Sequence, residues 1–113
     1  IDNPNLPARV RSVTAPELKK LLDEKSPLRL YDVRPAAERA LASISHALPF
    51  DDKARAELES LPKDTMLVFH CHHGMRSSAA AEQVAQKGFR NVWNLTGGIE
   101  AWSTQADPRV PRY

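Results

Sequence analysis

The chain has 113 residues, which is the length of one compact domain. Hydrophobic residues make up 42% and charged residues 27%, a composition typical of a soluble globular protein, and we expect a cytoplasmic one. The net charge is only +2 and the basic residues are scattered, so we expect no nucleic acid partner. The longest apolar run, at residues 66–69, is far too short to span a membrane. With a single cysteine, the chain cannot form an intrachain disulfide.

The two ends of the chain differ in composition from the middle. Residues 1–9 and 104–113 each hold two prolines and few apolar residues, which predicts a flexible N-terminal segment and a loose C-terminal tail. Residues 10–103 form the predicted domain. The chain begins at Ile1 rather than Met, which suggests either a processed protein or a segment of a longer one.

In the first half of the domain, strand and helix patterns alternate. In chain order they predict a strand at Val10–Val13, a helix from Thr14, a strand at 28–33, a short helical segment at 35–41 and a short strand at 44–48. The first helix has a clear start signal, because Thr14 and Glu17 have the spacing of a capping box.

The second half continues the alternation. It predicts a helix at 51–61, a buried strand at 65–70, an Ala-rich helix at 77–87, a strand at Val92–Leu95 and a short helix from 97 to 102. Strands that alternate with helices predict an α/β fold, with a parallel sheet covered by helices on both faces. Ligands of such sheets bind beyond the carboxyl ends of the strands. The residues that follow His70 are therefore the first place to look for a site.

The only cysteine lies at this point. Cys71 stands between the buried strand and the Ala-rich helix, where loop N–H groups and the helix dipole favour a thiolate. Arg76 adds a permanent cation nearby, and the thiolate is the reactive form of cysteine. The alternative is a buried structural cysteine, but the neighbours of Cys71 are polar rather than apolar. The pattern favours a nucleophile.

Three further groups near the cysteine have two interpretations each. His72 and His73 either line the mouth of a pocket or are simply exposed loop residues, and Arg34 either faces incoming anions or pairs with Glu38. A metal site is not expected, because consecutive residues such as 70–73 cannot all converge on one tetrahedral ion. We predict no metal and no cofactor.

The loop from Cys71 to Ser77 resembles the active-site loop of the rhodanese family, in which four residues separate the cysteine from Arg76. Three more stretches agree with that family, namely residues 31–34 with Glu38, residues 88–92 and residues 95–102. The resemblance covers residues 12–103 and implies a three-layer fold with a mostly parallel sheet of about five strands. The loop is also similar to that of rhodanese domains fused to a glutaredoxin-like domain.

The resemblance implies sulfur transfer through a persulfide on Cys71. It implies substrate binding by His72, His73, Gly74, Met75, Arg76, Ser77 and Arg34. The implied partners are a small anionic sulfur donor such as thiosulfate and a thiol, cyanide or protein thiol acceptor. Two alternatives remain, a phosphatase or arsenate-reductase-like enzyme that uses the same thiol, and a non-catalytic rhodanese module for protein interaction.

Overall fold

Five short parallel strands form the centre of the molecule. The computed structural model describes residues 10–113, so the segment 1–9, predicted to be flexible, lies outside the described residues. The strands are β1 Val10–Val13, β2 Arg29–Asp32, β3 Leu48–Pro49, β4 Leu67–His70 and β5 Val92–Leu95. They are arranged in the order β1-β5-β4-β2-β3, with every described pairing parallel.

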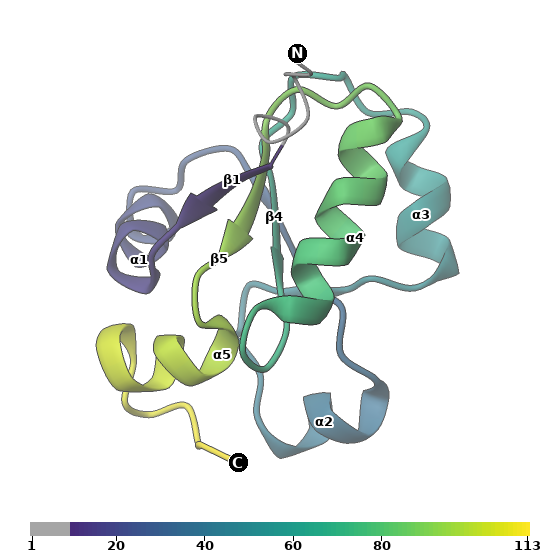
Figure 1. Ribbon diagram of the computed structural model, residues 1–113. Helices are drawn as coiled ribbons and strands as arrows, with labels where there is room; N and C mark the ends of the chain where they lie inside the picture. Colours follow the sequence, from purple (N-terminus) through teal and green to yellow (C-terminus); the bar gives the residue numbers. More distant parts are fainter. Residues whose placement is uncertain (1–9) are drawn as a thin grey trace.

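Helices cover both faces of this sheet, as Figure 1 shows. They are α1 Ala15–Asp23, α2 Ala36–Leu41, α3 Asp52–Leu58, α4 Met75–Gln86 and α5 Gly98–Ala101, which runs on into a π-helical turn at Trp102–Ala106. The predicted α/β fold with a five-stranded parallel sheet and helices on both faces is confirmed.

The two hydrophobic cores follow from the alternation of side chains along the strands. In β4, Val68 points to a core shared with α1 and α5, whereas Leu67 and Phe69 point to a core shared with α3 and α4. All four residues of β4 are buried, which fits a central strand covered on both sides.

Several element boundaries differ from the predicted ones, and two of these differences have a clear cause in the backbone. The predicted strand at 44–48 is reduced to β3, because the backbone turns between Ile44 and Ala47, whose N–H donates to the Ile44 carbonyl (2.9 Å). Helix α4 begins at Met75 rather than at Ser77, since Gly74 adopts a left-handed conformation that starts the helix earlier.

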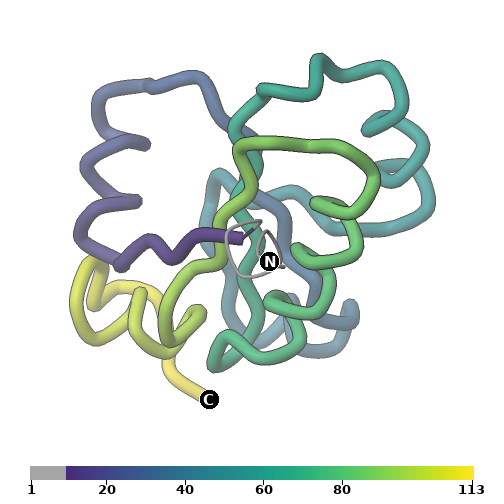
Figure 2. The backbone as a smooth tube through the Cα atoms, turned by 45° about the horizontal axis from the view of Figure 1, so that its top comes forward, coloured from purple at the N-terminus to yellow at the C-terminus, as the bar shows by residue number. Residues whose placement is uncertain are grey.

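The C-terminal residues, predicted as a loose tail, pack against the domain. The last helix extends beyond residue 102 through the π-helical turn, and Val110 contacts the core on the α1 side. Figure 2 shows this C-terminal segment in yellow beside the purple α1. None of the helices in residues 10–113 is both long and apolar enough to cross a membrane.

Candidate active site

Cys71 directly follows β4 and lies under the amino end of α4. Cys71 is 1% exposed, so its thiol lies beneath the loop rather than on the surface. The loop can turn back over the thiol because Gly74 has φ +111°, a conformation that side chains with Cβ rarely adopt. The sequence placed the cysteine at this junction, and the structure has it there.

Two backbone N–H donors and one hydroxyl surround the sulfur. The backbone N–H groups of Gly74 and Ser77 approach Cys71 Sγ at 3.1 and 3.3 Å, and the Ser77 hydroxyl lies at 3.4 Å. Burial raises the pKa of the Cys71 thiol, but the hydrogen bonds from Ser77, Gly74 and His73 outweigh burial and bring the pKa below its ordinary value. The loop therefore favours the thiolate.

Asn94, at the carboxyl end of β5, holds this loop from the neighbouring strand. Its Oδ1 accepts a hydrogen bond from Ser77 Oγ (2.5 Å), and its Nδ2 donates to the Gly74 carbonyl (3.1 Å). We did not single out Asn94 from the sequence. The available signal was a polar residue near the end of a strand that lies next to the cysteine-bearing strand.

The start of α5 supports the other side of the loop. The Cys71 carbonyl accepts from the Ile99 N–H (2.8 Å), and the His72 carbonyl accepts from the Glu100 N–H (3.1 Å). This approach requires Gly98, because a Cβ there would come within 2.4 Å of the Cys71 carbonyl oxygen. The two glycines at 97 and 98 thus form a tight turn.

Arg76 lies at the rim of the site, which is the solvent-exposed edge of the Cys71 loop, and forms a salt bridge with Glu38 of α2. Its guanidinium donates to both carboxylate oxygens of Glu38, at 2.8 and 2.9 Å. The hydrogen bond from Arg76, followed by that from Tyr113, lowers the pKa of Glu38 to about 2. The positive charge of Arg76, predicted to lie near Cys71, is therefore shared with a carboxylate.

Arg34, expected to bind substrate, lies beside Asp32, and none of the hydrogen bonds described for its side chain goes to a residue of the Cys71 loop. Its side chain is buried and donates to both carboxylate oxygens of Asp32, at 2.9 and 2.6 Å, and to the Ala42 carbonyl at 2.7 Å. The alternative, pairing with the carboxylate of Glu38, is also not what the structure shows, because Arg34 reaches only the Glu38 backbone carbonyl (3.4 Å). Arg34 pairs with Asp32 instead, because the Asp32 carboxylate is only two residues away and is buried like Arg34 itself.

His70 lies on the buried side of the same group. Its ring is fully buried, with Nε2 3.7 Å from an Asp32 carboxylate oxygen. Burial lowers the pKa of His70 to about 4, with Arg34 adding to the effect and Asp32 opposing it. His70 is therefore neutral at pH 7 and belongs to the interior rather than to the mouth of the site.

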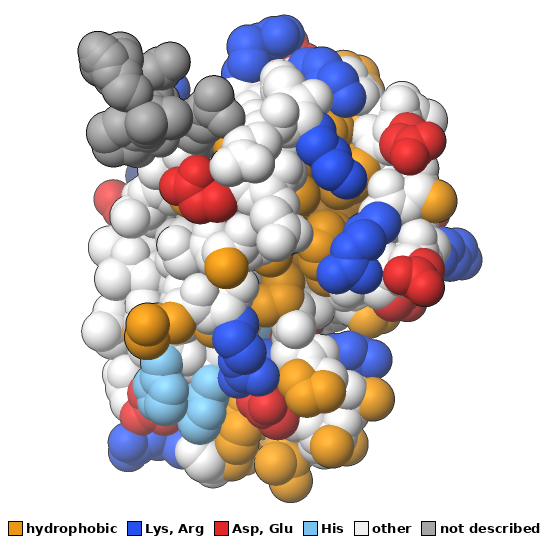
Figure 3. Space-filling model, turned by 45° about the vertical axis from the view of Figure 1, so that its right-hand side comes forward, with side chains coloured by type: hydrophobic (Ala, Val, Ile, Leu, Met, Phe, Trp, Pro, Cys, Tyr) orange, Lys and Arg blue, Asp and Glu red, His pale blue; other side chains and the backbone are white. Residues whose placement is uncertain are grey.

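The histidines after the cysteine form a stack at the surface. The rings of His72 and His73 are 4.0 Å apart, and His72 also stacks on Tyr113 with 3.9 Å between ring centroids. Figure 3 shows histidine side chains gathered on one face beside basic and acidic side chains. Met75 is 84% exposed, so it extends from the rim into solvent.

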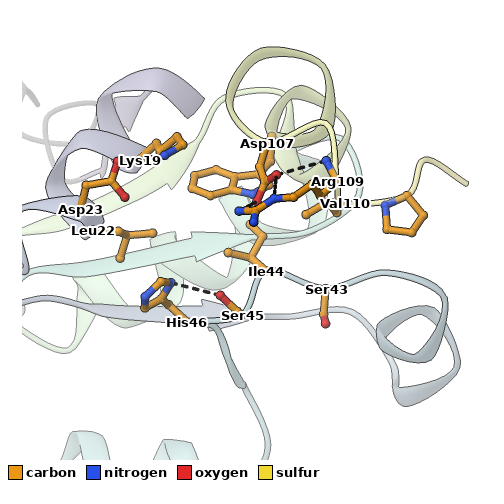
Figure 4. Close-up of a pocket in the computed structure, with 12 residues that line it drawn as sticks. Lys19, Leu22, Asp23, Ser43, Ile44, Ser45, His46, Asp107, Arg109 and Val110 are labelled. Atoms are coloured by element: carbon orange, nitrogen blue, oxygen red, sulfur yellow. Dashed lines mark hydrogen bonds and ion pairs between the residues drawn. The ribbon is translucent and has the colours of Figure 1, made fainter.

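A separate cavity of about 520 Å³ lies between α1, the turn after α2 and the C-terminal segment (Figure 4). None of its lining residues comes from the segment 70–77. Four of the charged lining residues already form salt bridges with one another, Lys19 with Asp23 and Arg109 with Asp107. The hydrogen bonds to Sγ identify the Cys71 loop, rather than this cavity, as the candidate site. Within residues 10–113, no three His, Cys, Asp or Glu side chains are grouped so that they could hold a metal ion.

Comparison with known proteins agrees with this geometry. Residues 14–105 match the family described as "Rhodanese-like domain". The chain is 37% identical to "Adenylyltransferase and sulfurtransferase MOCS3-2" from Zea mays, over 96% of this chain and 24% of that protein. It thus spans about a quarter of the length of that relative, and a similar share of several others.

Two further relatives are short proteins that this chain covers almost completely. A protein named "Sulfurtransferase" from Allochromatium vinosum is 32% identical, over 89% of this chain and 95% of that protein. The crystal structure of a rhodanese-like domain protein from Staphylococcus aureus has a TM-score of 0.72 at 30% identity and covers 91% of this chain and 98% of that one. By its family match, its relatives and its fold, the chain belongs to the rhodanese family.

Proposed function

We propose that this protein is a sulfurtransferase that carries a sulfane sulfur on Cys71. The donor in this proposal is thiosulfate or a persulfide, and the acceptor is a thiol, a protein thiol or cyanide. Membership of the rhodanese family and relatives named as sulfurtransferases support the activity. The observation that carries the assignment to Cys71 is the pair of backbone N–H donors, with one hydroxyl beside them, around its sulfur.

The chemistry has two steps. The Cys71 thiolate attacks the outer sulfur of thiosulfate, a new S–S bond forms, and sulfite leaves with the electron pair of the broken S–S bond. The resulting Cys71 persulfide is then attacked at its terminal sulfur by a thiolate or cyanide, which regenerates the Cys71 thiolate. No net oxidant or reductant is consumed, since sulfane sulfur passes unchanged from donor to acceptor.

The loop residues have distinct parts in this proposal. Gly74 and Ser77 stabilise negative charge on sulfur through their N–H groups, in the manner of preorganised donors. His72, His73 and Arg76 lie at the rim, where they meet the incoming donor. Met75 is exposed beside them and contacts only the outer part of a bound donor.

The direct test is the mass of the protein after incubation with thiosulfate. The wild type should gain the mass of one sulfur atom, and cyanide or dithiothreitol should remove it. Cys71→Ser should show neither the adduct nor thiocyanate formation. Ser78→Ala, which changes the next helical residue after the Ser77 donor, should behave as the wild type. Wild-type turnover by Cys71→Ser would refute the proposal.

The phosphatase or arsenate-reductase-like alternative uses the same thiol. Only four residues separate Cys71 from Arg76, and the resulting ring of N–H donors is small for a tetrahedral phosphate. We therefore expect no turnover of p-nitrophenyl phosphate. The alternative of a non-catalytic module is disfavoured because the chain retains Cys71 in a setting that lowers the pKa of its thiol.

A further inference from the structure

We propose that Asn94 is a positioning residue that controls the reactivity of Cys71 by competing with its sulfur for the hydroxyl proton of Ser77. This inference rests on the proposed function in one respect, that Cys71 is the reacting thiol. None of the hydrogen bonds described for residues 10–113 joins Asn94 to the sulfur; it acts through Ser77 and Gly74.

The sheet brings Asn94 to this position. Strand β5 lies next to β4, and Asn94 pairs with Phe69, two residues before Cys71. From the carboxyl end of β5, the amide reaches both the first turn of α4 and the Gly74 peptide. Two points of the sulfur-binding loop are therefore attached to one side chain.

The hydrogen-bond network fixes the orientation of the amide. Its oxygen faces a hydroxyl and its nitrogen faces the carbonyl oxygen of Gly74. With the two atoms exchanged, the amide oxygen would face another acceptor and one good hydrogen bond would be lost. Asn94 Oδ1 is thus an acceptor directed at Ser77 Oγ.

The Ser77 hydroxyl has one proton for three nearby acceptors. These are Asn94 Oδ1 at 2.5 Å, the Gly74 carbonyl at 3.3 Å and Cys71 Sγ at 3.4 Å. The shortest contact, to Asn94, holds the proton for most of the time, and Ser77 Oγ then presents lone pairs to the sulfur. The hydroxyl lowers the pKa of Cys71 only when its proton turns towards Sγ, so the acceptor strength at position 94 sets how readily this happens.

Replacement by aspartate strengthens the acceptor with almost no change in shape, and it also removes the Nδ2 donor to the Gly74 carbonyl. In Asn94→Asp, an anionic carboxylate should keep the Ser77 proton and add negative charge near the sulfur. Both effects disfavour the thiolate, so alkylation of Cys71 by iodoacetamide at pH 7 should be roughly tenfold slower and its pH midpoint should be higher. Above that midpoint, the rates of variant and wild type should converge.

Asn91→Asp is the matched control, because it makes the same charge change at the opposite end of β5. The Asn91 amide bonds to the Trp93 ring N–H and the Asp64 carbonyl, away from the Cys71 loop. Its alkylation profile should match that of the wild type.

Asn94→Leu gives a test of sign. It removes the strongest competing acceptor, so that Sγ shares the Ser77 proton only with the Gly74 carbonyl, and the midpoint should move to lower pH, below that of the wild type. A merely structural role for Asn94 would have the opposite effect, because a loosened loop loses the donors that stabilise the thiolate. A midpoint raised by Asn94→Leu would therefore overturn the proposal.

In this proposal, position 94 changes the reactivity of Cys71 through the Ser77 hydroxyl. In a Ser77→Ala background, Asn94→Asp should slow alkylation much less than it does in the wild type. An equal effect in both backgrounds would show that charge alone acts, and the proposal would fail. Alkylation requires no sulfur donor, so these results stand apart from the proposed function, which fails separately if wild-type protein gains no sulfur from thiosulfate.

Discussion

Beside the Cys71 loop, three buried polar side chains depend on one another. Asp32 accepts from the guanidinium of Arg34 and lies 3.7 Å from the ring of His70, and all three are at most 2% exposed. The Arg34 backbone N–H also donates to Asp32 (2.9 Å), so the carboxylate holds the turn after β2. Burial, together with the nearby Arg34 cation, opposes a further proton on His70, and the Asp32 carboxylate offsets only part of this effect.

We predict that His70 makes folding sensitive to acid. Its pKa is lowered from 6.5 to about 4 in the folded protein, so the unfolded chain binds the proton first as the pH falls. Its stabilising effect is complete above about pH 6.5 and is lost as the pH drops towards 4. The loss should reach about 3 kcal/mol in the free energy of unfolding. Urea denaturation at a series of pH values measures it.

The replacement His70→Asn should flatten this pH dependence between pH 6.5 and 4, even if it lowers stability at pH 7. His46→Asn, at an exposed histidine, should leave the slope unchanged. A slope in His70→Asn equal to that of the wild type would show that other groups cause the acid sensitivity.

At the scale of elements, the start of α5 is fitted closely to the Cys71 loop. Gly97 and Gly98 have φ +75° and +61°, and the N–H groups of Ile99 and Glu100 bond to carbonyls at residues 71 and 72. The close approach of two backbone segments is the reason for Gly98, and the left-handed turn is the reason for Gly97.

We expect Gly98→Ala to destabilise the protein by at least roughly 1–3 kcal/mol, because strained backbone is added to a collision with backbone atoms. The new Cβ would lie 2.4 Å from the Cys71 carbonyl oxygen and 2.5 Å from that of His72. Chemical denaturation measures the change in the free energy of unfolding.

Gly88→Ala separates the two causes. Gly88 also has a positive φ, +105°, but a Cβ there would meet only the end of the Lys63 side chain at 4.0 Å. Its loss of stability should be smaller than that of Gly98→Ala. The close fit would be disproved if the two variants lost the same stability.

At the scale of the whole molecule, the C-terminal segment connects parts that are distant in the chain. The Tyr113 hydroxyl donates to Glu38 (2.6 Å) and accepts from Arg34 (2.9 Å), while its ring stacks on His72. With Arg76 on the other side of Glu38, α2, the active-site loop and the C-terminal segment form one contact network at the rim.

We predict that Tyr113→Phe costs roughly 1 kcal/mol of stability, because it removes hydrogen bonds to two charged side chains at a partly exposed site. Tyr113→Ala should cost more, since the stack on His72 is lost as well. Urea denaturation of the three proteins compares them. Equal stability of Tyr113→Phe and wild type would show that solvent replaces both hydrogen bonds.

The sequence by itself determined the features that depend on neighbouring residues. The capping box of Thr14 and Glu17 forms as its spacing predicts, with both reciprocal hydrogen bonds present. The apolar run before His70 becomes the central strand, and Cys71 follows it at the start of a helix. Such local patterns act within a few positions, so they are readable before the fold is known.

Only the tertiary structure decided which side chains become partners. Arg76 and Tyr113 reach Glu38 across 38 and 75 positions of sequence, and Ser77 meets Asn94 across 17. Spacing along the chain gives no signal for these pairs, because the register of β4 against β5 and the packing of the C-terminal segment bring them together. The same packing buries Arg34 against Asp32, since a buried charge requires the nearest opposite charge.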